Sequence, residues 1–374
     1  MNFSLFVEHF CDIKDPRQKA KIGYPFFDLL FGSLCAVIAG AEGWKDIQEY
    51  INGHLNWFQK QGFFPHGAPV DDTIARAIGR IEPKQFQQCF ISWMQSVHKL
   101  TDGELVAIDG KTLRGSYCPD DRKSTIHMVN AYACANHLVI GQHKTDAKSN
   151  EITAIPELIA LLDIKGGLIS IDAMGCQKDI AKCIVDKGAD YLLAVKANQE
   201  SLYLAIRAAF EEQLNAEPCL EQFYVEQQHG RTEARFYAVQ EIDHKAAPFS
   251  QWKGLKSIGV TIGFRKEKGK APSLEYRYYI SSKILDEEEF ADAVRGHWAI
   301  ESMHWQLDVC MKEDDCQIYK DHGAQNWAIM RQFSLNMLKA ETSKGSLVTK
   351  RDRAWMRTDF LEKILLAGLA RTIG

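Results

Sequence analysis

The first hundred residues carry apolar side chains at the spacing of amphipathic helices. Phe26, Phe27, Leu30, Leu34, Val37 and Ile38 form one stripe, and Ile47, Tyr50, Ile51, Leu55 and Phe58 form a second. Residues at these intervals share one face of a helix. Asp71-Asp72-Thr73 is typical of a helix start, and the short helix after it carries Arg76 and Arg80. One more amphipathic helix is predicted over Gln85–His98.

We therefore predict a helical domain over residues 1–100. Its helix, turn and arginine-bearing helix match the outline of a helix-turn-helix, which makes the domain a candidate for DNA binding. Any small helical domain produces the same pattern, so both interpretations stay open.

After Thr101-Asp102-Gly103 the pattern changes to that of strands. Apolar runs bounded by turn residues predict strands at Leu105–Ile108, Ser124–Ala135, Leu138–His143, Leu168–Asp172 and Tyr191–Val195. Helices are predicted at Ile155–Leu162, 177–187 and Leu202–Phe210. Three strands joined by short turns, followed by strand–helix units of the parallel type, are the succession of an RNase H-like fold. The predicted fold class is α/β, with an RNase H-like core, a mixed sheet flanked by helices, over residues 101–340.

A second β-rich region is predicted from about 215 to 285. Its short strands are Phe223–Gln227, Arg235–Ile242, Leu255–Phe264 and Tyr276–Ser281. The connection Arg265–Lys270 is a basic hairpin tip. It suits DNA contact, and it equally suits a solvated turn whose lysines guard an edge strand.

A helix is predicted from Glu287 to Lys312, and four ionisable side chains and one tryptophan share one of its faces. His297, Glu301, His304, Trp305 and Asp308 recur at intervals that place them on this face. Trp298, Ile300, Met303 and Leu307 form a neighbouring apolar stripe that would anchor the helix. A solvated face normally mixes carboxylates with lysines, and this face has no lysine before Lys312. The pattern therefore favours a functional face.

The end of the chain is its most basic part. A last helix is predicted over about Trp327–Lys339. From Thr342 onward, seven Lys or Arg residues stand against three acidic residues. For residues 341–374 we predict a flexible basic tail that is attracted to phosphates.

Composition limits the class of protein. The 374 residues are 46% hydrophobic and 25% charged, with a net charge of −4, which is ordinary for a soluble globular protein. The ten cysteines include no C-x-x-C pair, which argues against zinc fingers and thioredoxin-like chemistry. The most apolar run, Leu29–Ala41, is too short for a membrane span, and the N-terminus is unlike a secretory signal. We predict a buried helix there, and a cytoplasmic protein with reduced cysteines and no membrane partner.

Asp109 closes the apolar run Leu105–Ile108 and is followed by glycine and two cations, Lys111 and Arg114. This pattern predicts a buried strand that delivers a carboxylate to a sheet edge, with cations beside it for an anionic ligand. An aspartate at a strand end is also a common turn former. A phosphate-binding P-loop is excluded because a leucine stands where its first glycine is required. Asp172 ends a second buried strand in the same way.

Six motifs together resemble one family. They are Ile108–Ser116, Lys148–Pro156, Ile171–Gln177, Lys196–Gln199, His229–Arg231 and the pair His297–Glu301 with His304–Val309. In this order and spacing they resemble the insertion-sequence transposases of the H-repeat-associated type, within the DDE superfamily. The resemblance runs nearly end to end, because residues 1–100 are similar to that family's N-terminal associated domain.

The resemblance implies that Asp109, Asp172 and Glu301 are the catalytic carboxylates and the metal ligands. It also implies that the β-rich region is an insertion within the catalytic domain. A related insertion-sequence pattern has tyrosine, arginine and lysine where this chain has Val294, His297 and Asp308. Asp308 cannot replace a lysine as a cation.

The implied activity is that of a DNA transposase. It would hydrolyse phosphodiester bonds at the element ends with two metal ions, then transfer the 3′-hydroxyl into target DNA. Hard cations such as Mg²⁺ prefer carboxylate oxygens, so three acidic side chains suit Mg²⁺, with Mn²⁺ as its substitute. Asp109 would bridge both metals, and Asp172 and Glu301 would each complete one site.

The implied partner is double-stranded DNA, at the element ends and at the target. A homodimer is expected because transposition synapses two ends. Lys111 and Arg114 are expected to hold phosphates, and Lys196, Asn198, His297 and Arg231 are further candidate DNA contacts. For Lys196, Asn198 and the adjacent Gln199, capping of a helix is an equally good interpretation.

Two other functions are compatible with parts of the sequence. A catalytically silent, transposase-derived protein that still binds DNA would keep the same motifs. A nucleotide-dependent metabolic enzyme would need Asp172 as a ribose-binding acid, and the chain lacks the glycine fingerprint that accompanies one.

Overall fold

The computed structural model describes residues 4–18, 22–121, 124–145, 151–211, 223–228, 231–243 and 245–369. Helices fill the described part of the first hundred residues, as predicted: α1 (Ser4–Phe10), α2 (Phe26–Ala39), α3 (Trp44–Gly53), α4 (Leu55–Lys60), α5 (Asp71–Ile78) and α6 (Pro83–Val97). The predicted buried helix is α2, whose residues from Asp28 to Ala39 are all buried. The buried Asp28 carboxylate accepts a hydrogen bond from the Phe64 N–H (2.7 Å), which ties α2 to the loop after α4.

The sheet has the topology predicted for an RNase H-like core. Its strands here are β1 (Leu105–Leu113), β2 (Ile126–Ala133), β3 (Leu138–Lys144), β4 (Leu168–Ile171) and β5 (Asp190–Val195). β1, β2 and β3 pair antiparallel, and β4 and β5 continue from β1 in parallel. The connections carry α7 (Glu151–Leu161) and α8 (Lys178–Asp186), and the short turn η2 (Ala197–Gln199) and α9 (Glu200–Ala209) follow β5. The carboxyl ends of β1, β4 and β5 therefore share one edge of the sheet.

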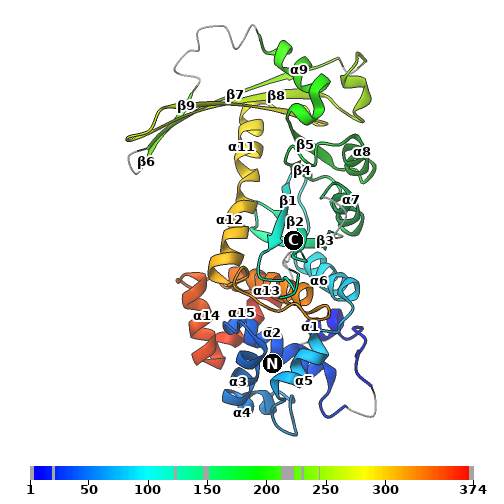
Figure 1. Ribbon diagram of the computed structural model, residues 1–374, viewed down its shortest axis with the longest axis vertical. Coiled ribbons are helices and arrows are strands. Elements are labelled where there is room, and N and C mark those ends of the chain that lie inside the picture. The colour runs from blue at the N-terminus through cyan, green and yellow to red at the C-terminus, as the bar shows by residue number, and fades with distance from the viewer. Residues whose placement is uncertain are drawn as a thin grey trace.

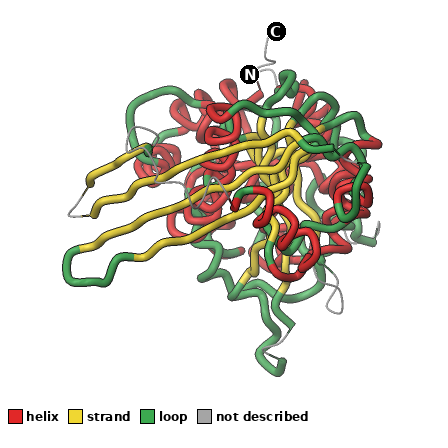
Figure 2. The backbone as a smooth tube through the Cα atoms, turned by 90° about the horizontal axis from the view of Figure 1, so that it is seen from above, coloured by secondary structure: helices red, strands yellow, loops and turns green. Residues whose placement is uncertain are grey.

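The β-rich region joins this sheet. Its strands are β6 (Tyr224–Gln228), β7 (Arg231–Glu241), β8 (Ser257–Glu267) and β9 (Ser273–Ser281), with a short turn η4 (Phe249–Gln251) between β7 and β8. β9 pairs antiparallel with β5, so the described strands form one sheet in the order β3-β2-β1-β4-β5-β9-β8-β7-β6. Figure 2 shows the outer ends of β6–β9 projecting well beyond the helices.

The inner half of this extension is covered on both faces. Tyr278 packs against Tyr203 of α9, and the next residue, Tyr279, packs against Phe290 of α11 (Glu287–His297). Successive residues of a strand point to opposite faces, so α9 and α11 lie on opposite sides of the sheet. The outer half of β9 is exposed and that of β8 is partly exposed, which leaves an open sheet surface beyond the two helices.

The helix predicted over Glu287–Lys312 forms in three pieces. α11 is followed after one residue by α12 (Ala299–Trp305) and then by a π-helical turn, η5 (Gln306–Cys310). Figure 1 shows α11 and α12 running from the projecting strands, past the core, to the helical layer. Ile300, Met303 and Leu307 are fully buried, as predicted, but Trp298 is 46% exposed. The apolar stripe was wrong at Trp298 because this residue lies at the junction of the two helices.

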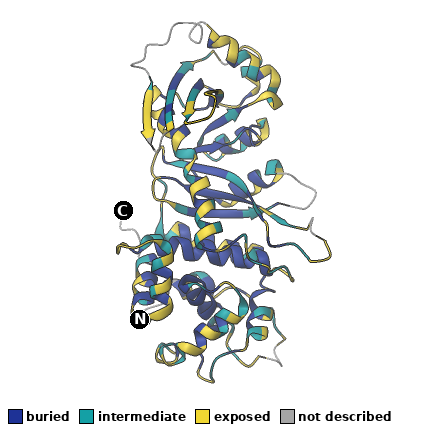
Figure 3. Ribbon diagram, turned by 60° about the vertical axis from the view of Figure 1, so that its left-hand side comes forward, coloured by how far each residue is buried: buried dark blue, intermediate teal, exposed yellow. Residues whose placement is uncertain are grey.

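The prediction of a flexible basic tail is wrong. After the buried helix α13 (Gly323–Ala340), the chain forms α14 (Leu347–Met356) and α15 (Thr358–Leu369). Phe360, Leu361, Ile364 and Leu365 recur at helical spacing and are buried. Lys350 is buried too, and its ammonium group lies 3.2 Å from the Glu341 carboxylate. Figure 1 shows α13, α14 and α15 beside the N-terminal helices, and Figure 3 shows buried and exposed residues interspersed along the helices of this layer.

No single helix in the described ranges is long and apolar enough to cross a membrane; α2 and α3 reach the necessary length only together, across a bend of 96°.

Candidate active site

Asp109 and Asp172 lie side by side at one edge of the sheet. The residues that precede them are partners in the parallel register of β1 and β4, so the next position on each strand is an aspartate. Neighbouring strands are about 4.8 Å apart, which brings the two side chains together. The Asp172 carboxylate accepts hydrogen bonds from the backbone N–H groups of Met174 (3.0 Å) and Gly175 (3.2 Å), and these bonds fix its orientation.

Glu301 approaches the same edge from α12. It is exposed in the first turn of this helix, whose other side is buried through Ile300 and Met303. One turn later, His304 Nδ1 lies 3.7 Å from Asp109 Oδ2, and His304 Nε2 lies 3.2 Å from the Asn130 amide on β2. His304 therefore ties the helix that carries Glu301 to the strand that carries Asp109.

Asp109 lies near several other carboxylates. Burial raises the pKa of Asp109 to about 7, and the negative charges of Asp172, Glu151 and Glu301 add to the rise. Burial also lowers the pKa of His304 to about 3, so its neutral ring does not compensate the charge. Within the described residues, none of the four carboxylates forms an ion pair with a lysine or an arginine.

Glu151 is the member of this group that was not predicted as a site residue. It opens α7, and it is about half-buried. A methyl group on Gly110, next to Asp109, would overlap the Glu151 carboxylate. The predicted motif Lys148–Pro156 contains Glu151, but its first three residues, 148–150, lie outside the described part of the chain. An acidic residue opening the helix that follows the three-strand unit is the signal that could have found it.

The donor set of this edge suits a divalent cation. Four carboxylates offer only oxygen ligands, which Mg²⁺ and Mn²⁺ prefer, and they gather without a basic side chain to balance them. Among the described residues, no group of three or more His, Cys, Asp or Glu side chains is arranged as it would be around a bound ion. The residues fit a metal centre in their chemistry and in their place on the sheet.

Lys111 does not hold a phosphate as predicted. Its ammonium group is buried against Asp308 and lies 3.0 Å from the Glu313 carboxylate. The nearby negative charges outweigh burial and raise the pKa of Lys111. Asp308 stands where the related insertion-sequence pattern has a lysine. In this chain it pairs with Lys111, a lysine that comes from β1. The ion pair fastens η5 to the core instead of binding a ligand.

Arg114 and Lys196 are two of the predicted contacts whose side chains are exposed to solvent. The Arg114 side chain is 79% exposed, and its guanidinium lies 3.6 Å from Asp314. Lys196 is exposed where β5 ends, at the same sheet edge as the aspartates.

Asn198 and Gln199 brace the loop after Asp172. The Asn198 amide donates to the Ala173 carbonyl (2.8 Å), and the Gln199 amide donates to the Cys176 carbonyl (2.9 Å). Their side chains therefore hold the backbone that orients Asp172, which differs from both the phosphate contact and the helix cap considered from the sequence.

His297 is turned toward the core. Its Nδ1 lies 2.8 Å from the Ser170 hydroxyl on β4, and burial lowers its pKa, so the ring is neutral at pH 7. It anchors the end of α11 beside the strand that leads to Asp172.

Arg231 lies away from the carboxylates, at the start of β7. With Arg235, Arg265, Arg277 and Arg295 it lines a hollow of about 550 Å³ between the open sheet surface and the end of α11, which we term the arginine hollow. His229 and Gly230, the other residues of that motif, lie outside the described residues.

The arginine hollow combines positive charge with an exposed aromatic ring. Five arginines and three glutamates line it, and each arginine side chain is at least 30% exposed. The Arg277 guanidinium lies over the Trp298 ring, 5.0 Å from its centroid. Trp298 is three residues before Glu301, so the hollow adjoins the helix that presents Glu301.

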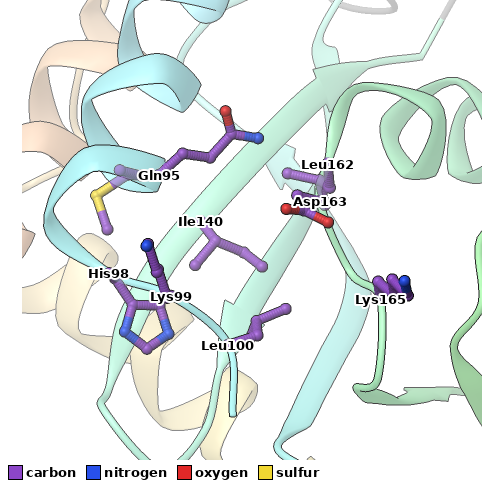
Figure 4. A pocket seen from close by; sticks show the side chains of 9 residues that line it. Gln95, His98, Lys99, Leu100, Ile140, Leu162, Asp163 and Lys165 are labelled. Carbon is purple, nitrogen blue, oxygen red and sulfur yellow. The ribbon is translucent and has the colours of Figure 1, made fainter. Parts of the chain in front are cut away.

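Another hollow, of about 410 Å³, lies at the other end of the sheet. Figure 4 shows His98 and Lys99 at the end of α6 on one side of it, Asp163 and Lys165 on the other, and Ile140 of β3 between them. Residues 98–100 and 162–165 precede β1 and β4, whereas the aspartates follow the buried parts of those strands. This hollow is therefore remote from the carboxylates.

Comparison with known proteins decides the family. The family model described as "Transposase DDE domain" matches residues 100–337, and the one described as "DDE_Tnp_1-associated" matches residues 7–94. The chain belongs to the DDE transposase family. This membership supports a DNA transposase that binds DNA, and transposase domains of this kind generally use divalent metals.

Its relatives match over almost their whole length. The chain is 45% identical to "Putative transposase YncI" of Escherichia coli O157:H7, over 98% of this chain and 95% of that protein. It is 43% identical to "H repeat-associated putative transposase YhhI" of Escherichia coli K12, over 98% of both. Among solved structures, a piggyBac transposase synaptic complex with hairpin DNA overlaps 96% of this chain and 77% of that chain, with a TM-score of 0.42 and 11% identity.

Proposed function

We propose that this DDE transposase cleaves DNA at the ends of its element and joins the freed 3′-hydroxyl to target DNA, with Asp109, Asp172 and Glu301 as the catalytic carboxylates. The observation that carries the proposal is the gathering of these three side chains, from two parallel strands and one helix, at a single sheet edge. The runner-up is a catalytically silent relative that keeps the DNA-binding surfaces.

The proposed roles follow from position. Asp109 is central in the group and would be shared between two cations, while Asp172 and Glu301 would each complete one site. Bound there, Mg²⁺ or Mn²⁺ would activate a water molecule and stabilise the leaving oxygen of the phosphodiester. Asn198 and Gln199 hold the Asp172 loop, and His304 and His297 hold α12 and α11 against the sheet. The chain thus supplies a fixed set of oxygen donors and the supports that orient them.

We propose that the DNA backbone lies across the arginine hollow and continues past Glu301 to Arg114 and Lys196. A guanidinium has five N–H donors, so an arginine already paired with a glutamate keeps donors for a phosphate. The exposed Trp298 offers a surface on which a base or a sugar can pack. Contacts of this kind give salt-dependent affinity without reading the sequence.

The N-terminal helical domain is the proposed reader of base sequence. Arg76 and Arg80 are more than half exposed, although they already pair with Asp72 and Asp321. Two protomers, each holding one element end, would form the synaptic complex, and the proposed location is the cytoplasm.

The test is cleavage of a labelled duplex that carries the element's end sequence. Purified protein with Mg²⁺ is expected to nick this duplex and leave a 3′-hydroxyl, and a duplex of scrambled sequence is expected to stay intact. Binding of the end sequence without nicking, in Mg²⁺ and in Mn²⁺, would support the silent relative instead.

A further inference from the structure

We propose that Glu151 is a fourth carboxylate of the metal centre and supplies an oxygen ligand to the cation held by Asp109 and Asp172. This inference rests on the proposed function, because it concerns the same centre. It adds a residue from a helix that the three-carboxylate scheme leaves out.

The first observation is the contact between Glu151 and Gly110. A methyl group at residue 110 would overlap the Glu151 carboxylate, with the second carboxylate oxygen at 2.7 Å. The absence of a side chain at Gly110 therefore makes room for this carboxylate beside Asp109. In a strand interior, glycine costs stability and often marks a close approach of another group.

The second observation is that buried side chains hold α7 against the backbone near the two aspartates. Its residues Ala154, Ile155, Leu158 and Ile159 are buried. Ile155 packs so closely on Gly175 that a methyl group there would lie 3.1 Å from the Ile155 side chain. Gly175 is the residue whose N–H donates to Asp172. The first two turns of α7 thus lie against the backbone near both aspartates, at Gly110 through Glu151 and at Gly175 through Ile155.

The third observation is that Glu151 has no basic partner among the described residues. A half-buried carboxylate without a cation is costly, and here the carboxylates of Asp109 and Asp172 lie nearby. A glutamate in the first turn of a helix gains about 0.3–1 kcal/mol from the helix dipole alone. The helix dipole would stabilise Glu151 equally well if its side chain pointed elsewhere, so the dipole does not explain why the Glu151 carboxylate lies against Gly110. A shared cation explains both the direction and the missing partner.

The test is calorimetric titration of the full chain with Mn²⁺ alone. Glu151→Gln keeps the size of the side chain and removes its charge, and it is expected to weaken Mn²⁺ binding on the order of 10- to 100-fold. The matched control is Glu157→Gln on the same helix, since Glu157 is 64% exposed and pairs with His143. This control is expected to bind Mn²⁺ as the unaltered chain does.

A thermal melt without metal separates a ligand from a structural acid. Removing one of four like charges is expected to leave the Tm of Glu151→Gln equal to or above that of the unaltered chain. A lower Tm together with unchanged Mn²⁺ binding would overturn the inference and leave Glu151 a helix-stabilising residue.

Asp109→Asn distinguishes this inference from the proposed function. If Asp109→Asn loses Mn²⁺ binding and Glu151→Gln does not, only the role of Glu151 fails. If neither variant changes binding, the metal centre itself fails.

Discussion

At the scale of single residues, the buried Lys111 is central to how the site is held. Its ammonium group balances Asp308 and Glu313, and the Glu313 side chain is only 2% exposed. Replacing one partner of such a group leaves an uncompensated buried charge, which is far more costly than losing an exposed ion pair.

We predict that Lys111→Met lowers the free energy of unfolding by about 3–5 kcal/mol, because Glu313 would be left buried with no cation. Urea denaturation measures this loss. Arg114→Met is the control, since its 79% exposed side chain predicts a change within about 0.5 kcal/mol. Equal stability of the two variants would mean that Lys111 is not a structural ion pair.

Lys339 gives a prediction about pH. Burial lowers its pKa to about 8, although its ammonium group donates to the Tyr132 hydroxyl (3.0 Å) and the His137 carbonyl (3.1 Å). Between about pH 8 and the ordinary lysine value of 10.5, the unfolded chain keeps a proton that the folded chain has lost. The free energy of unfolding therefore gains a positive slope with pH over this window.

We predict that Lys339→Met removes this gain. Urea denaturation at several values between pH 7.5 and 10.5 compares the variant with the unaltered chain, and the difference between the two isolates Lys339. The exposed Lys99→Met is the control. A constant difference across the window would show that the Lys339 pKa is not lowered by folding.

The sequence located the residues whose position depends on local pattern. Asp109 and Asp172 each end an apolar strand, so their place at a sheet edge followed from the strands themselves. The partners of Lys111 could not be predicted in the same way, because Asp308 lies 197 positions away along the chain. Glu151 was not predicted for a related reason: it lies on α7 and its neighbour Gly110 lies on β1, and only the packing of α7 on the sheet brings them together.

At the scale of elements, α11 connects the projecting part of the sheet to α12, the helix that carries Glu301. Phe290 of α11 packs on Gly259 of β8, where a methyl group would lie 2.5 Å from the ring. The helix can therefore sit close to the sheet only because residue 259 has no side chain. α11 leads directly into α12, so the packing of α11 on β8 affects the position of Glu301.

We predict that Gly259→Ala destabilises the fold by about 1–3 kcal/mol and slows DNA nicking, because Phe290 must move. Gly263→Ala on the same strand is the matched control, since the nearest atom to its methyl group would be 4.0 Å away. Thermal melts of both variants and a nicking assay of Gly259→Ala test this; Gly263 lines the arginine hollow, so Gly263→Ala is the control for the melts alone. If the two variants melt alike, the packing of α11 does not depend on this contact.

Elements were predictable where their periodicity was unbroken. The strand and helix order of the core followed from alternating and helical spacing, and the structure has that order. Two features depended on tertiary contacts instead. Trp298 falls at a helix junction, where the stripe of Ile300, Met303 and Leu307 no longer applies. The basic residues after Thr342 hid the apolar spacing of α15, because the net charge of a segment says little about its buried face.

At the scale of the whole molecule, the nine described strands form one sheet, and this sheet carries both the carboxylates and the arginine hollow. The carboxylate edge lies in the RNase H-like core, and the arginine hollow lies on the projecting extension of the same sheet. α11 and α12 run between them, as Figure 1 shows. A duplex bound along this path would contact both surfaces, and the net charge of −4 does not oppose this because the positive charge is local.

We predict that the double variant Arg277→Ala/Arg295→Ala weakens DNA binding and lowers the slope of log affinity against log salt by about 2, one for each lost phosphate contact. Binding isotherms at several salt concentrations measure both effects. Arg207→Ala is the control, because Arg207 is exposed on α9, on the opposite face of the sheet. An equal loss in the control would show that the effect is one of overall charge.

Asp109, Asp172 and Glu301 are proposed to form one metal-dependent centre that cleaves DNA. The single-turnover rate of nicking of the element-end duplex in Mg²⁺ measures the activity of this centre. Asp109→Asn, Asp172→Asn and Glu301→Gln are each expected to lower this rate on the order of 10³-fold or more, because bound metal contributes several kcal/mol to the reaction. All three are expected to keep their affinity for the duplex, and the exposed Asp163→Asn is expected to nick at the unaltered rate. Metal-dependent nicking that persists in any of the three carboxylate variants would contradict the account.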